Sequence, residues 1–114
     1  MMKSIALLFL SFFACTSVFA AGTADGFRVQ EIRIDDNGKG FVMFDQALTG
    51  ERAACAGAFP KHLAFDTATS GGKSILSLAL TAYSTQSKIL ARGTGDCGHM
   101  GVVESWKSGL LIKE

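Results

Sequence analysis

Apolar and polar positions divide the chain into a leader and a β-rich body. Residues 1–20 carry one charge, Lys3, ahead of an almost unbroken apolar run, IALLFLSFF, and they end in Val18-Phe19-Ala20. This layout, with small residues on either side of one large one before the cut, is typical of a secretory signal peptide. We therefore predict cleavage after Ala20 and a single mature domain over residues 21–114, located in the periplasm or outside the cell.

Two other interpretations of the leader stay open. A retained membrane anchor needs roughly 20 apolar residues, and the run here is shorter. A lipoprotein would use Cys15, but the bulky Phe13 occupies a position that prefers small residues in such signals. We expect no membrane association once the leader is removed.

In the first β-like segment of the body, the alternation of apolar and polar positions changes phase partway along. We expect residues 21–25 to be frayed and residues 26–35 to form the first strand. Because the side chains of a strand alternate between its two faces, a bulge or sharp coil near residues 30–31 is needed to bury all of its apolar side chains together. The apolar residues on either side of that point are Phe27 and Val29, then Ile32 and Ile34.

A hairpin is predicted directly after this strand. Asn37-Gly38 favours a type I′ turn, which needs two positive φ angles, and residues 40–45 return as the second strand. The same stretch, DDNGKG, has a calcium-loop interpretation. That interpretation is disfavoured because Lys39 would place a cation at a ligand position.

The rest of the chain adds one helix and three strands. A short strand at residues 63–66 precedes a helix over residues 73–86, where apolar positions recur every three or four residues. Strands follow at residues 87–92 and about 102–113, the last with Trp106, Leu110 and Ile112 inward. The order β-β-β-α-β-β predicts a mainly β fold, the five-stranded Greek-key barrel called an OB-fold. An open α+β sheet with one packed helix is the alternative.

Composition excludes some classes of function. Removing 20 of the 114 residues leaves 94, and it removes Lys3 but no acid, so ten basic residues balance ten acidic ones. A neutral chain argues against a nucleic-acid binder, which shows a basic surplus. The 13 glycines, about twice the usual share, indicate tight turns between strands.

Cys55 and Cys97 are the two cysteines of the predicted mature chain. Export supplies an oxidising compartment, so we predict that they form a structural disulfide worth roughly 4 kcal/mol. A redox pair or a metal site is disfavoured, because there is no C-x-x-C and the two histidines are distant in sequence. We expect neither a cofactor nor a metal.

Several short segments between Cys55 and Lys113 form one pattern: Cys55, Leu63-Ala64-Phe65-Asp66, residues 78–82, Gly93-Thr94-Gly95-Asp96-Cys97 and Glu104-Ser105. On these residues the chain resembles a family of small, uncharacterised exported bacterial proteins. The element order also resembles the binding (B) subunits of bacterial AB5 toxins, disulfide-linked OB-folds that assemble into rings and bind host glycans. In cholera-like subunits one cysteine lies near the N-terminus, whereas Cys55 follows the second strand, and no receptor-contact motif carries over.

Two glycine-rich motifs favour structural interpretations. Residues 93–98 match G-x-G-x-x-G, but no helix is predicted after them to hold a pyrophosphate, so we expect a turn. Gly72-Lys73-Ser74 resembles the end of a phosphate-binding loop, yet Thr67 stands where its first glycine belongs. A helix cap is the simpler interpretation.

Candidate catalytic chemistry is sparse. Ser105, His99 and Asp66 could compose a hydrolase triad, and Glu104 with Asp66 a carboxylate pair, but no G-x-S-x-G or other spacing supports either. His62 and His99 fit surface or turn positions. Trp106 is the single candidate ligand contact, because an indole ring serves either core packing or stacking on a ligand.

We therefore predict a non-catalytic exported binding module whose partner is a protein or a glycan. The first alternative is a glycan-binding subunit that assembles into a ring, which would make the chain a homo-oligomer. A small periplasmic hydrolase is a remote alternative.

Overall fold

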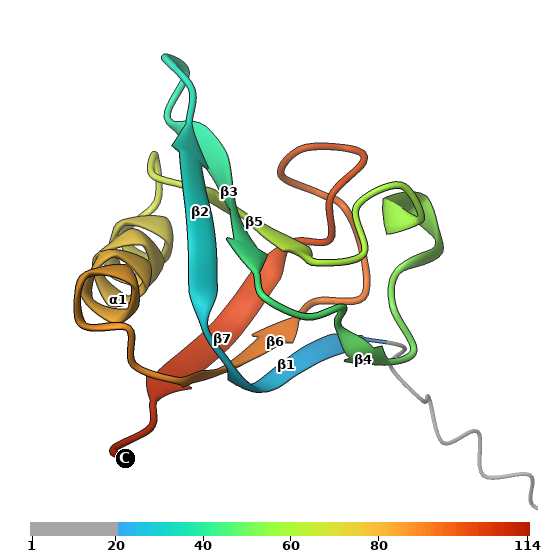
Figure 1. The fold of residues 1–114 in the computed structure, drawn as a ribbon. Coiled ribbons are helices and arrows are strands. Elements are labelled where there is room, and N and C mark those ends of the chain that lie inside the picture. The colour runs from blue at the N-terminus through green and yellow to red at the C-terminus, as the bar shows by residue number, and fades with distance from the viewer. Residues whose placement is uncertain (1–20) are drawn as a thin grey trace, which may run out of the picture.

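A computed structural model describes residues 21–114, so the predicted signal peptide lies outside the described residues. This part of the chain forms seven strands, one α-helix and one short 3₁₀ helix (Figure 1). No helix within it is long and apolar enough to cross a membrane. In chain order the elements are β1 (Gly22–Phe27), β2 (Val29–Ile34), β3 (Lys39–Phe44), β4 (Thr49–Gly50), η1 (Ala54–Ala56), β5 (His62–Asp66), α1 (Ser70–Thr85), β6 (Ile89–Gly93) and β7 (Trp106–Leu111).

The strands form two sheets with antiparallel ladders. One has the order β4-β1-β6-β7 and the other the order β2-β3-β5. β1 continues into β2, so one long segment passes from the first sheet into the second (Figure 1). The expectation of a closed barrel is wrong. On the side where a barrel would close, a single parallel bridge between Ala64 and Ser105 replaces a ladder between β5 and β7.

The predicted break in the first strand is confirmed. β1 and β2 are interrupted at Arg28, and the register of β2 against β3 shifts between Val29 and Glu31. This shift lets Phe27 and Val29 enter the core that Ile32 also contacts, whereas Ile34, expected to be buried with them, is 52% exposed. The expected fraying at residues 21–25 is wrong, because residues 22–25 belong to β1, which pairs with β4 on one side and with β6 on the other.

The hairpin between β2 and β3 is present, but its turn is not type I′. Among non-glycine residues in the described part of the chain, only Gln86 has a positive φ, so Asn37 does not supply the angle that a type I′ turn needs. Instead, Gly38 (φ 83°) follows the turn and donates its N–H to the Asp35 carbonyl at 3.0 Å. A turn followed by a left-handed glycine is the usual three-residue hairpin connection.

The helix begins three residues before the predicted Lys73. Thr69 caps it, because its hydroxyl accepts the Gly72 N–H at 2.9 Å. A Cβ at Gly72 would overlap the carbonyl of Asp66, so only glycine permits this approach of helix to strand. The segment Gly72-Lys73-Ser74 is therefore the start of a capped helix.

The core lies between the two sheets and α1. The helix contributes Ala79 and Ala82, and it contacts β2, β5 and β7. The predicted inward position of Leu110 is wrong, since its side chain is 50% exposed. The buried core residues are Ala24, Phe27, Val29, Val42, Phe44, Leu48, Leu63, Phe65, Ala79, Ala82, Ile89, Ala91 and Trp106.

A disulfide and a buried carboxylate hold the loops at the end of the molecule away from α1. The predicted Cys55–Cys97 disulfide is present and joins η1 to the loop after β6. Glu104 is fully buried, and its two carboxylate oxygens accept three backbone N–H groups. We call these four residues the Glu104 junction: Gly22 (2.8 Å), Ala53 (2.8 Å), Gly95 (3.2 Å) and Glu104 itself.

Candidate functional site

A groove of about 630 Å³ runs between β2 and α1. Five consecutive residues of β2, numbers 30–34, line one wall. Because neighbours in a strand point to opposite faces, a wall of consecutive residues is the edge of the strand. Leu76, Leu80 and Tyr83 line the other wall, and their spacing of four and three residues places them on one helix face. We call this space the β2–α1 groove.

The edge of β2 that borders the groove is unpaired. β2 is the outer strand of the sheet β2-β3-β5, and within residues 21–114 no strand adds to its free side. Asp35 donates its N–H across the hairpin to Lys39 at 2.7 Å. Because backbone direction alternates along an antiparallel strand, Ile32 and Ile34 turn their N–H and C=O groups outward. Such an edge can bind an added strand.

Exposed apolar side chains gather at the same place. Residues 21–114 contain six large apolar side chains that are exposed, and three of them line the β2–α1 groove. These are Ile34 (52%), Leu80 (48%) and Tyr83 (47%). A contiguous apolar surface next to unpaired backbone is typical of an interaction site.

An aromatic cluster extends from the groove onto the outer face of the sheet. The ring of Phe41 lies 4.8 Å from that of His62 and 6.2 Å from that of Phe59, centre to centre. The guanidinium of Arg33 sits 5.5 Å from the centre of the Phe41 ring, a cation–π distance. Phe41 therefore belongs both to this cluster and to the groove wall.

The surroundings of His62 in this cluster change its pKa. Burial lowers its pKa below the usual 6.5, and Lys61 adds to that lowering, whereas the Glu31 carboxylate acts against both. Its Nδ1 atom is buried and has no hydrogen-bond partner among the described residues. The neutral imidazole is thus the favoured form near pH 7.

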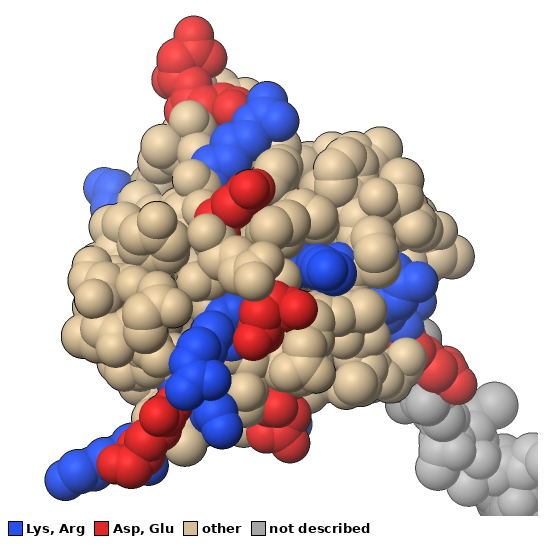
Figure 2. Space-filling view, viewed as in Figure 1, with Lys and Arg blue, Asp and Glu red and all other residues tan. Residues whose placement is uncertain are grey.

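Charges are distributed unevenly around the groove. Figure 2 shows acidic and basic patches alternating along the strip that covers β2, while the surface over α1 is largely uncharged. Of the residues that line the β2–α1 groove, Glu31 and Arg33 are the two charged ones. They are two positions apart in β2, so they lie on the same face of the strand.

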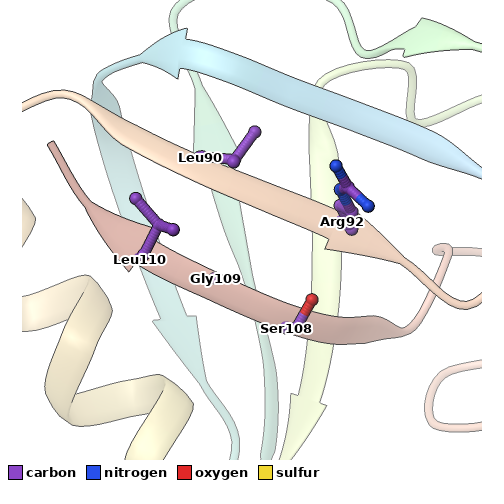
Figure 3. Close-up of a pocket in the computed structure, with 5 residues that line it drawn as sticks. All are labelled: Leu90, Arg92, Ser108, Gly109 and Leu110. Carbon is purple, nitrogen blue, oxygen red and sulfur yellow. The ribbon is translucent and has the colours of Figure 1, made fainter.

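A smaller hollow of about 260 Å³ lies on the other sheet (Figure 3). Leu90 and Arg92 of β6 and Ser108, Gly109 and Leu110 of β7 line it. A Cβ at Gly109 would lie 3.1 Å from both Leu78 and Trp106, so this glycine allows the core to pack closely behind the hollow. One guanidinium and one hydroxyl do not make a nucleophile with a base.

The structure places the predicted ligand contact Trp106 in the core. Its side chain is 2% exposed, and its ring packs 5.8 Å from that of Phe44. The indole N–H donates to the carbonyl of Ser108 at 2.7 Å. These contacts favour the core-packing interpretation of Trp106 over stacking on a ligand.

The residues considered for catalysis have other contacts. Ser105 is buried, and its hydroxyl accepts the backbone N–H of His99 at 3.1 Å. Glu104 is enclosed by backbone amides, so a carboxylate pair with Asp66 has no support. Within residues 21–114 no cluster of three His, Cys, Asp or Glu side chains could hold a metal.

The glycine-rich motif at residues 93–98 forms a turn. Gly95 (φ 86°) donates its N–H to Glu104, and no helix follows. The Thr94 hydroxyl, and then the Gly98 N–H, lower the pKa of the Asp96 carboxyl by hydrogen bonding to it. The motif therefore orders a loop, and a dinucleotide site has no support.

Sequence reasoning did not find the β2–α1 groove, although the phase shift in β2 was visible. Only the observed pairing reveals that β2 is an edge and that α1 stands beside it (Figure 1). No protein-family model, curated protein or solved structure matches the chain. The geometry of residues 21–114 is therefore the basis for assigning a function.

Proposed function

We propose that this chain is an exported, non-catalytic binding module whose binding site is the β2–α1 groove. One observation carries the proposal: an unpaired strand edge faces a helix that presents exposed Leu80 and Tyr83 to it. An added peptide strand would satisfy the outward backbone groups of β2 while its side chains cover the apolar wall. The partner is therefore a protein segment in extended conformation.

Export and architecture form part of the proposal. The leader pattern of residues 1–20 supports secretion, and the Cys55–Cys97 disulfide suits an oxidising compartment. An OB-like arrangement is supported by the element order, by the shared β1–β2 segment and by the parallel bridge between Ala64 and Ser105. The fold alone does not specify a ligand.

Glycan binding is the second candidate, and one observation favours it. OB-folds bind oligosaccharides on the face of their second and third strands, which correspond here to β3 and β5. Phe41, Phe59 and His62 form their aromatic cluster on that side. Aromatic rings at a surface can stack against the apolar faces of sugars.

The test screens the mature protein against a displayed peptide library and a glycan array. We expect extended apolar peptides to bind, and Leu80→Asp to weaken their binding at least tenfold because it places a charge in the apolar wall. Leu110→Asp is the matched control, since Leu110 is 50% exposed and lies outside the groove. Circular dichroism checks that both variants fold.

Two outcomes would contradict the groove as the binding site. In the first, peptide binding is equal in wild type and Leu80→Asp. In the second, glycans bind instead of peptides, Phe59→Ala, in the aromatic cluster but outside the groove, abolishes that binding and Leu80→Asp leaves it intact, which would support the glycan candidate.

A further inference from the structure

We infer that the occupant of the β2–α1 groove is β2 of a second copy of this chain, added antiparallel about a two-fold axis at Ile32. The inference rests on the proposed function and names its partner. The two three-stranded sheets β2-β3-β5 would then join edge to edge into one continuous sheet. A two-fold contact of this kind uses the same surface on both copies.

Charge complementarity selects the second copy as the occupant. When two β2 strands run antiparallel with Ile32 facing Ile32, position 31 of each copy lies opposite position 33 of the other. Glu31 of one copy therefore faces Arg33 of the second copy, and this pair occurs twice. Opposite charges at directly facing positions stabilise a strand pair, whereas like charges destabilise it.

The two neighbouring central positions, Glu31 and Arg33, do not satisfy these charges. An axis at Glu31 would place two carboxylates opposite each other, and an axis at Arg33 would do so with two guanidinium groups. Ile32 is also the position whose N–H and C=O point outward, so an axis there aligns the backbone groups for hydrogen bonding. Among positions 31 to 33, charge and backbone direction thus both select Ile32.

The guanidinium of Arg33 can donate hydrogen bonds to a second carboxylate. In one copy its Nε and Nη2 atoms donate to Asp35 at 2.8 and 3.4 Å, and its side chain remains 58% exposed. A guanidinium carries five N–H donors, so Nη1 is available to Glu31 of the second copy. Glu31 is itself exposed.

The same axis covers the exposed apolar residues. A two-fold axis normal to the sheet places both α1 helices on the same side of it. Leu80 and Tyr83 of the two copies would then approach one another, with Ile34 beside them. All three are about half exposed in a single copy, so pairing removes apolar area from water at the centre of the contact.

Sedimentation equilibrium of mature residues 21–114, with the disulfide oxidised, tests this inference. We expect the wild type to dimerise, and Glu31→Arg and Arg33→Glu each to raise the dissociation constant at least tenfold. Mixing these two variants should restore dimers, because two arginines of one copy then face two glutamates of the other. The double variant Glu31→Arg/Arg33→Glu should also dimerise by itself.

Two further variants keep the test decisive. Glu51→Arg is the matched control, because Glu51 is exposed outside the groove, and it should dimerise like the wild type. Ile34→Pro removes an outward N–H without a new charge, and it should weaken the dimer even if Arg33→Glu proves unstable. Proline is tolerated on the free side of an edge strand.

The outcomes separate this inference from the proposed function. A wild type that stays monomeric at all concentrations, an assembly indifferent to positions 31 and 33, or a mixture that fails to pair would overturn the inference. If the wild type is monomeric and Leu80→Asp still abolishes peptide binding, the groove is a binding site for another protein. A ring of more than two copies would also overturn the two-fold pairing.

Discussion

The Glu104 junction and the β2–α1 groove differ in whether their backbone polar groups have hydrogen-bond partners within the chain. At the junction, amides from three segments donate to one buried carboxylate at 2.8 to 3.2 Å. Along β2, the amides and carbonyls of alternate residues face a groove of about 630 Å³. Because polar groups need partners when buried, the junction is complete within one chain, and the groove becomes complete only when something binds.

The two regions also differ in packing: atoms are closely packed at the junction, and apolar side chains are exposed at the groove. A Cβ at Gly93 would overlap the carboxylate of Glu104, and the disulfide joins residues two positions beyond Ala53 and Gly95. The groove instead exposes Leu80 and Tyr83. The motif-rich loops of this chain therefore hold the fold together, and the plainer β2 segment is the part that we propose binds a partner.

The largest expected effect comes from removing the junction carboxylate. Glu104→Ala leaves three amide groups without their acceptor in a buried place, so we expect a loss of about 3 kcal/mol in the free energy of unfolding. Urea denaturation followed by circular dichroism measures the loss. Glu51→Ala, at an exposed glutamate, should change stability by less than about 0.5 kcal/mol.

Equal unfolding free energies for these two variants would contradict the comparison. The three amides would then have other partners or access to water when the carboxylate is absent. A loss that is confined to Glu104→Ala would show that the junction depends on this one side chain.

A smaller effect is expected from His62, beside the groove. Burial lowers its pKa in the folded chain below 6.5, so the unfolded chain binds more protons as the pH falls through that range. Stability from this group is therefore present above about pH 6.5 and is lost on acidification. We expect the urea midpoint to fall between pH 7.5 and 5, and to fall less in His62→Gln than in wild type.

His99→Gln is the control for this pH dependence, because His99 lies on the loop after β6 and outside the aromatic cluster. It should keep the wild-type profile. A His62→Gln profile identical to that of wild type would mean that the imidazole titrates alike in the folded and unfolded chains.

Local features of the fold were predictable from the sequence. The change of parity between Val29 and Ile32 required an irregular strand, and the register shift lies there. The helical period and the two cysteines also led to the observed α1 and disulfide. The irregular strand and the helix are each determined within one segment of the chain. The disulfide was predictable because two cysteines allow only one pairing.

Long-range features were not predictable in this way. Nothing local to Glu104 shows that Gly22 and Ala53 would surround it, since these residues are 82 and 51 positions away. Barrel closure failed as a prediction because it depends on how far β5 and β7 run side by side, and the single bridge there joins Ala64 of β5 to Ser105, just before β7. The groove requires knowing which strand is an edge, and that is a property of the whole sheet.

Amide hydrogen exchange, measured on residues 21–114 at low and at high concentration, tests the central contrast most directly. We predict that the N–H groups of Gly22, Ala53 and Gly95 are protected at both concentrations, because Glu104 accepts them within one chain. The N–H groups of Ile32 and Ile34 should exchange fast when dilute and become protected when concentrated. Protection of Ile32 and Ile34 that is the same at both concentrations would contradict the account.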